Sequence, residues 1–103
     1  MTIKTLDQHI ERTPGVAGGK ARVAGRRIKV ADIAVWHERI GMSADEIASE
    51  YDLTLVEVYA ALAYYFAHRA ELDREIEEGI AFAEAVRRQI PSKVRQKLDP
   101  GGD

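Results

Sequence analysis

The stretch SADEIASEYDLTLVEVYAALAYYF, residues 43–66, decides the fold because it contains two helix starts with a tight break between them. Ser43 is followed three residues later by Glu46, and Thr54 three residues later by Glu57. Each pair is a capping box, in which a hydroxyl and a carboxylate satisfy backbone amides that the first helical turn leaves free. The stretch therefore predicts a short helix, a turn and a longer helix, which are the proportions of a helix-turn-helix.

Two further helices are predicted on either side of this stretch. Upstream, apolar residues at helical spacing from Val30 to Ile40 predict a first helix that Gly41 ends. Downstream, a stripe that starts at Leu72 predicts a fourth helix, which Ile90-Pro91 closes and which is either separate from the third helix or continuous with it. In the third helix we expect burial of Leu55, Val58, Tyr59, Leu62, Tyr65 and Phe66.

The ends of the chain have a different character. Residues 1–20 contain glycines and a proline without periodicity, so we expect a loop-rich arm that lies on another surface. Alternation around Ala24-Gly25 predicts a two-stranded hairpin of 21–23 with 27–30, which is marginal alone and should pack on helices or pair in a homodimer. The chain then divides into the arm, a ribbon with the helix-turn-helix (21–68), a carboxyl-terminal helix (69–90) and a disordered basic tail (91–103).

The composition excludes several classes of protein. The 103 residues suffice for one domain, and 46% apolar and 31% charged residues exclude a wholly disordered chain. The absence of cysteine excludes a disulfide scaffold and thiolate metal sites, and it fits a reducing cytoplasm. The longest uncharged apolar run, Val58–Ala67, is half of the roughly 20 residues that cross a bilayer, and no secretory signal opens the sequence. We expect a mainly α, cytoplasmic protein without a membrane segment.

The motifs that suggest chemistry are incomplete. Gly18-Gly19-Lys20 lacks the first glycine and the following hydroxyl of a phosphate loop, so glycine turns are the better interpretation. His9, His37 and His68 are nearly 30 residues apart. The five acids between Glu71 and Glu78 point around a helix instead of converging. We therefore predict no enzymatic activity, no cofactor and no metal.

Charge is distributed unevenly along the chain. Residues 1–29 hold seven cations and two acids, whereas residues 30–68 hold one cation and seven acids. The third helix has no lysine or arginine, and phosphate neutralisation supplies most of the affinity for DNA, so the cations would have to come from the ribbon or from a second subunit. A plain helical bundle remains an equal alternative. The predicted DNA contacts are Lys20, Arg22, Arg26, Arg27, Lys29, Thr54 and Tyr59.

One set of short motifs follows in order along residues 7–78. They are His9-Ile10, Pro14-Gly15-Val16, Gly18-Gly19-Lys20, Gly25 to Val30, Gly41-Met42-Ser43, Glu46-Ile47, Leu53-Thr54 and Ala60 to Tyr64. Together these segments resemble the family catalogued as domain of unknown function 433. The resemblance implies a homeodomain-like three-helix core with a small β element, and a VapB-like antitoxin encoded beside a PIN-like ribonuclease toxin. Such antitoxins bind the toxin with one segment and operator DNA with another.

The resulting hypothesis is an antitoxin of a type II toxin–antitoxin pair that represses its own operator as a homodimer. The alternatives are a stand-alone transcriptional regulator and a protein-interaction module that does not bind DNA. The fourth helix and the basic tail are predicted to fold onto the toxin, and truncation before Glu71 is expected to leave a folded core. The predicted toxin contacts are Leu72, Ile76, Ile80, Val86, Arg87, Arg88 and Ile90.

Overall fold

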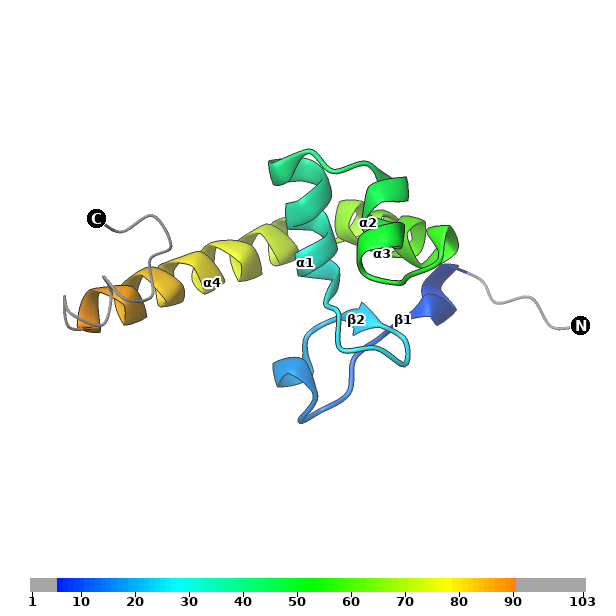
Figure 1. The fold of residues 1–103 in the computed structure, drawn as a ribbon. Helices are drawn as coiled ribbons and strands as arrows, with labels where there is room; N and C mark the ends of the chain where they lie inside the picture. Colours follow the sequence, from blue (N-terminus) through cyan, green and yellow to red (C-terminus); the bar gives the residue numbers. More distant parts are fainter. Residues whose placement is uncertain (1–5, 91–103) are drawn as a thin grey trace, which may run out of the picture.

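The structure, a computed structural model, describes residues 6–90 and confirms the mainly α fold with an additional carboxyl-terminal helix. Figure 1 shows three helices grouped into one body and the fourth leaving that body as a single long helix. A π-helix, Val35–Ile40, continues α1. The α-helices are α1 (Val30–Ala34), α2 (Ala44–Glu50), α3 (Leu55–Ala67) and α4 (Arg69–Gln89).

Both predicted capping boxes are present and set the start of the two central helices. Ser43 Oγ accepts from the Glu46 N–H at 3.0 Å, and the Ser43 N–H donates to the Glu46 carboxylate at 2.9 Å. Thr54 and Glu57 repeat the arrangement at 3.1 and 2.8 Å. Gly41 ends the π-helix with a φ of 91°, a left-handed conformation that glycine adopts without strain.

The core lies between α1, α2, α3 and the first turns of α4. Its fully buried large side chains include Ile33 of α1, Ile47 of α2 and Leu72 of α4. The buried face of α3 differs from the predicted one, because it includes Ala60 and Ala61. Helix α3 contacts both α1 and α2. Three side chains that we expected to be buried are therefore largely exposed, namely Leu55, Tyr59 and Phe66.

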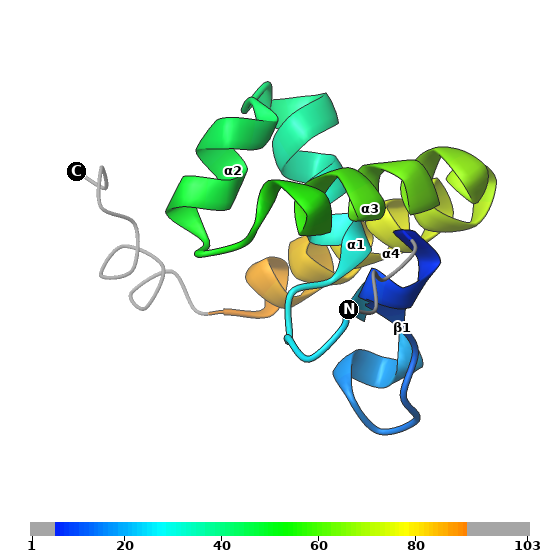
Figure 2. The same cartoon turned by 90° about the vertical axis from the view of Figure 1, so that its right-hand side faces the viewer.

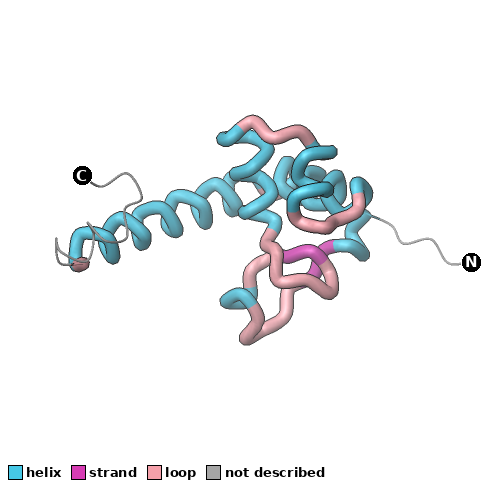
Figure 3. The backbone as a smooth tube through the Cα atoms, viewed as in Figure 1, coloured by secondary structure: helices cyan, strands magenta, loops and turns pink. Residues whose placement is uncertain are grey.

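The predicted ribbon exists with a different pairing. The antiparallel sheet joins β1 (Ile10–Glu11) to β2 (Arg22–Val23), and Figure 3 shows both as short strands between loops. The predicted hairpin partner, residues 27–30, is reduced to one bridge between Arg22 and Lys29. The reason is that α1 begins at Val30, so the chain leaves the sheet after one bridge and β1 takes the other edge of β2.

The described part of the arm lies on the helices of the same chain. A 3-10 helix, Leu6–His9, and β1 lie against α3, as Figure 2 shows. The Arg12 guanidinium donates to the Tyr64 hydroxyl at 3.0 Å and to the Glu71 carboxylate at 2.6 Å. The arm is thus part of the same body as the helices.

Helix α4 has two halves in different surroundings. Leu72 is fully buried and Ile76 is 7% exposed, whereas every residue from 77 to 89 is exposed. Arg39 of the π-helix pairs with Glu77 at 2.8 Å, at the point where the helix leaves the body. The basic tail, residues 91–103, lies outside the described residues. Among residues 6–90, no helix has both the length and the hydropathy that a bilayer crossing requires.

Candidate functional site

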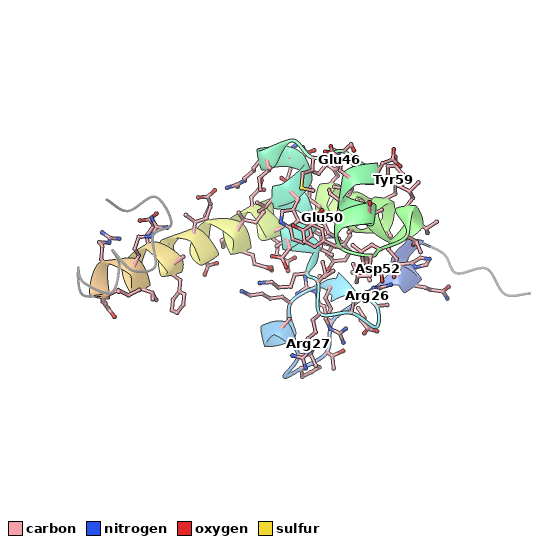
Figure 4. The ribbon with its side chains drawn as sticks, viewed as in Figure 1. Arg26, Arg27, Glu46, Glu50, Asp52 and Tyr59 are labelled. Atoms are coloured by element: carbon pink, nitrogen blue, oxygen red, sulfur yellow. The ribbon has the colours of Figure 1, made fainter. Side chains whose placement is uncertain are left out.

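The outer surface of α2 and of the first half of α3 is acidic and apolar. We call it the helix-turn-helix surface, and Figure 4 labels four of its residues. Residues 41–67 contain five carboxylates and no lysine or arginine. Such a surface repels phosphates, so it suits a protein partner better than DNA. Its exposed acidic and apolar side chains are Asp45, Glu46, Glu50, Asp52, Leu55, Val56 and Tyr59.

Arg22, predicted as a DNA contact, is a buried structural residue instead. It is 8% exposed, and its guanidinium donates to the Arg26 carbonyl at 2.8 Å and to the Thr13 hydroxyl at 2.9 Å. The same group lies 2.8 Å from the Glu11 carboxylate. These contacts hold the arm, the sheet and the turn after β2 together, and Arg22 cannot reach a phosphate.

Two further predicted DNA contacts, Arg26 and Thr54, make contacts that stabilise the fold. Arg26 Nε lies 3.5 Å from a carboxylate oxygen of Glu57, which joins the turn after β2 to the first turn of α3. Burial raises the pKa of Glu57, but hydrogen bonds from Thr54 and the charge of Arg26 outweigh it and keep that pKa below its ordinary value. Thr54 is occupied as the cap of α3. Tyr59 is 54% exposed on the acidic surface.

The two lysines of the predicted DNA set lie near acids of α4. Lys20 lines a shallow pocket of about 250 Å³ with three glutamates and Arg74. Burial raises the pKa of Glu75, and the charges of Lys20 and Lys29 partly offset that rise. One carboxylate oxygen of Glu75 is buried without a hydrogen-bond partner among the described residues. Part of the lysines' positive potential is therefore compensated within the chain.

The predicted toxin contacts divide between core and surface. Leu72 and Ile76 belong to the protein's own core, so they cannot contact a toxin, and truncation before Glu71 would remove core residues. Ile80 and Val86 are 46% and 42% exposed on the projecting half of α4. Arg87 and Arg88 are exposed, and Ile90 is half-buried. The predicted stripe omitted Phe82, which is 73% exposed and lies one turn before Val86 on the helix.

The described residues bring no group of three histidine, aspartate or glutamate side chains together that could hold a metal ion. The candidate site is a set of three surfaces: the helix-turn-helix surface, the turn with Arg26 and Arg27, and the projecting half of α4. These three surfaces differ in charge.

The sequence and the fold both match known proteins. The family described as "Protein of unknown function (DUF433)" matches residues 10–65. The crystal structure of a DUF433 member protein from Anabaena variabilis ATCC 29413 is 36% identical and superposes with a TM-score of 0.64. That match covers 70% of this chain and 71% of the other. No curated protein matches. From residues 10–65 and the shared fold, the chain belongs to the DUF433 family.

Proposed function

We propose that this chain is the antitoxin of a type II toxin–antitoxin pair and neutralises a PIN-like ribonuclease through the projecting half of α4. The proposal rests on one observation, the run of exposed residues from 77 to 89 in a helix that has left its own core. In this role the chain has no catalytic activity of its own and works in the cytoplasm beside the toxin.

The projecting half has the features of a helix that needs a partner. Helices shorter than about 12–15 residues are marginal in water when no tertiary contact supports them. This segment also contains Gly79, which costs roughly 0.5–1 kcal/mol in a helix relative to alanine. The apolar side chains of Ile80 and Val86, and of Phe82 one turn before Val86, are left in solvent. A groove on another protein that receives this stripe would stabilise the helix and gain affinity from it.

The chemistry of the segment fits a ribonuclease. Arg87 and Arg88 follow the apolar stripe on exposed positions at the end of α4. Metal-dependent ribonuclease sites are built from carboxylates, so a cationic helix end suits such a site. The resemblance to antitoxins encoded beside PIN-like toxins leads to the same partner.

The experiment is an inhibition assay with the purified product of a PIN-like ribonuclease gene beside the gene for this chain. The full-length chain is expected to suppress RNA cleavage by this ribonuclease. Ile80→Asp with Val86→Asp should raise the concentration needed for half inhibition at least about tenfold, because a charge replaces buried apolar contact. Ala81→Asp places the same charge on the opposite side of α4 and should inhibit as the unchanged chain does.

Two results would contradict the proposal. One is equal inhibition by the Ile80→Asp, Val86→Asp variant and by the unchanged chain. The other is the absence of inhibition by the unchanged chain, with circular dichroism showing that it is folded. The Ala81→Asp control separates a specific stripe from any effect of charge on α4.

Operator DNA is the second candidate partner, favoured by the capped pair α2 and α3 supported by α1. Because the helix-turn-helix surface has no cation, Lys20 and Lys29 would supply phosphate contacts from outside it. Replacing both by alanine should make the slope of log affinity against log salt shallower by about 0.9 for each lost contact. An unchanged slope would exclude these two lysines from the DNA interface.

A further inference from the structure

Two surfaces of opposite charge share a border on this molecule. Glu50 and Asp52 are exposed at the end of α2 and in the turn that follows it, and Arg27 is exposed in the turn after β2. The contact of Arg26 with Glu57, at 3.5 Å, joins the basic turn directly to the start of α3. Figure 4 shows the labelled acids over α2 and its following turn, with the labelled arginines beyond Asp52.

From this arrangement we infer that the chain forms a two-fold symmetric dimer through the helix-turn-helix surface and the turn with Arg26 and Arg27. A two-fold axis at the border places the basic turn of each copy against the acids of the other. Arg27 of one protomer then meets Glu50 of its partner, and the same contact occurs a second time by symmetry. The occupant of the surface is a second copy of this chain.

Apolar side chains beside the acids supply the rest of the interface. Leu55, Val56 and Tyr59 follow one another on the first two turns of α3 and are 42%, 51% and 54% exposed. Neighbouring apolar and aromatic side chains on a surface mark protein contacts, and tyrosine and arginine are enriched in them. Charge complementarity would set the orientation of the two protomers, and burial of the apolar side chains would stabilise the dimer.

A second copy explains these residues better than DNA does. DNA would bring phosphates against the exposed carboxylates of Asp45, Glu46, Glu50 and Asp52, and residues 41–67 contain no lysine or arginine. Arg26 already faces a carboxylate, and Arg27 is its neighbour in the same turn. The inference does not use α4, so it stands or falls independently of the proposed toxin contact.

The test is the mass of the full-length chain in solution, measured by light scattering at about 50 μM. The unchanged chain should have twice the mass of one chain. Arg27→Glu and Glu50→Arg should each give the mass of a single chain, because each places like charges across both symmetric contacts. Asp52 is left unchanged because its φ of 55° is a left-handed conformation that arginine adopts poorly.

Mixing the two variants is the decisive experiment. In a mixed dimer of Arg27→Glu with Glu50→Arg, both contacts again pair opposite charges, so the double mass should return. Glu84→Arg, on the projecting half of α4, is the control and should keep the mass of the unchanged chain.

A single-chain mass for the unchanged protein would overturn the inference, as would a mixture that stays monomeric. If Arg27→Glu keeps the double mass and only weakens binding to operator DNA, Arg27 serves DNA and the inference is wrong.

Discussion

The two halves of α4 belong to one helix with one apolar stripe, but the first half packs in the core and the second half is exposed. Leu72 and Ile76 in the first half lie in the core, and Tyr65 donates to Asp73 at 2.7 Å beside them. Ile80 and Val86 in the second half continue the stripe into solvent. An apolar stripe at helical spacing shows that a helix has a side to cover, but it does not show whether the same chain or another molecule covers it.

The largest expected effect is on the core half. Leu72→Ala should lower the free energy of unfolding by about 2–5 kcal/mol, because it removes a fully buried side chain and leaves a cavity. Val86→Ala in the projecting half should change it by less than about 0.5 kcal/mol. Urea unfolding followed by circular dichroism measures both. Equal losses of free energy would mean that the projecting half packs on the chain itself. They would contradict the distinction between a core half and an exposed half.

A smaller effect is expected at Gly79, where the projecting half begins. An alanine Cβ there meets nothing within 4 Å, and Gly79 is not among the positive-φ glycines. Gly79→Ala should therefore add about 0.5–1 kcal/mol to the stability of the helix beyond residue 77. The readout is an increase in helical circular dichroism of the lone chain. No increase would indicate that residues 77–89 are already fully helical through a contact with their surroundings.

The smallest effect is a pH dependence at Glu75, between the halves. Burial raises the pKa of this carboxyl in the folded chain above its ordinary value of 4.5, so the folded state binds the proton more tightly than the unfolded state. The contribution of Glu75 to stability therefore declines as pH rises from about 4.5 through the folded pKa. Glu75→Gln should be more stable than the unchanged chain at pH 7, and the difference should vanish below pH 4.

Glu57 provides a control of opposite sign for that measurement. Its pKa is lowered in the folded state, so its contribution is present above the ordinary value and is lost as pH falls. Glu57→Gln should be less stable than the unchanged chain at pH 7. Thermal unfolding of both variants between pH 3 and 7 measures the pair, and an equal shift in the same direction would contradict the assignment of Glu75 as a buried carboxyl.

Local signals in the sequence were sufficient for much of the fold. The capping boxes of Ser43 and Thr54 and the glycine stop at Gly41 are properties of a few adjacent residues, and all three were predicted correctly. The pairing of β1 with β2 joins Ile10 to Val23 and Glu11 to Arg22, and it depends on where α1 begins, so no local pattern contained it. The face of α3 was also misassigned in part, because Ala60 and Ala61 are buried while the larger Leu55, Tyr59 and Phe66 are exposed.

The prediction of site residues was limited for the same reason: a sequence pattern shows neighbouring residues, but not which distant residues the fold brings together. The excess of cations in residues 1–29 was visible in the sequence, but the partner of each cation is set by the fold. Arg22 is held by Glu11 and Thr13, and Arg26 by Glu57. A charge count shows how many cations exist, and only the fold shows which of them remain available to a partner.

The most direct test of the account is hydrogen–deuterium exchange on α4 of the full-length chain, alone and with the adjacent PIN-like ribonuclease. Residues 69–76 should be protected in both samples, because Leu72 and Ile76 anchor this half of the helix in the core. Residues 77–89 should exchange fast in the lone chain and become protected at least about tenfold in the complex. Strong protection of residues 77–89 in the lone chain, or no change on addition of the ribonuclease, would contradict the claim that this half of α4 is the toxin-binding helix.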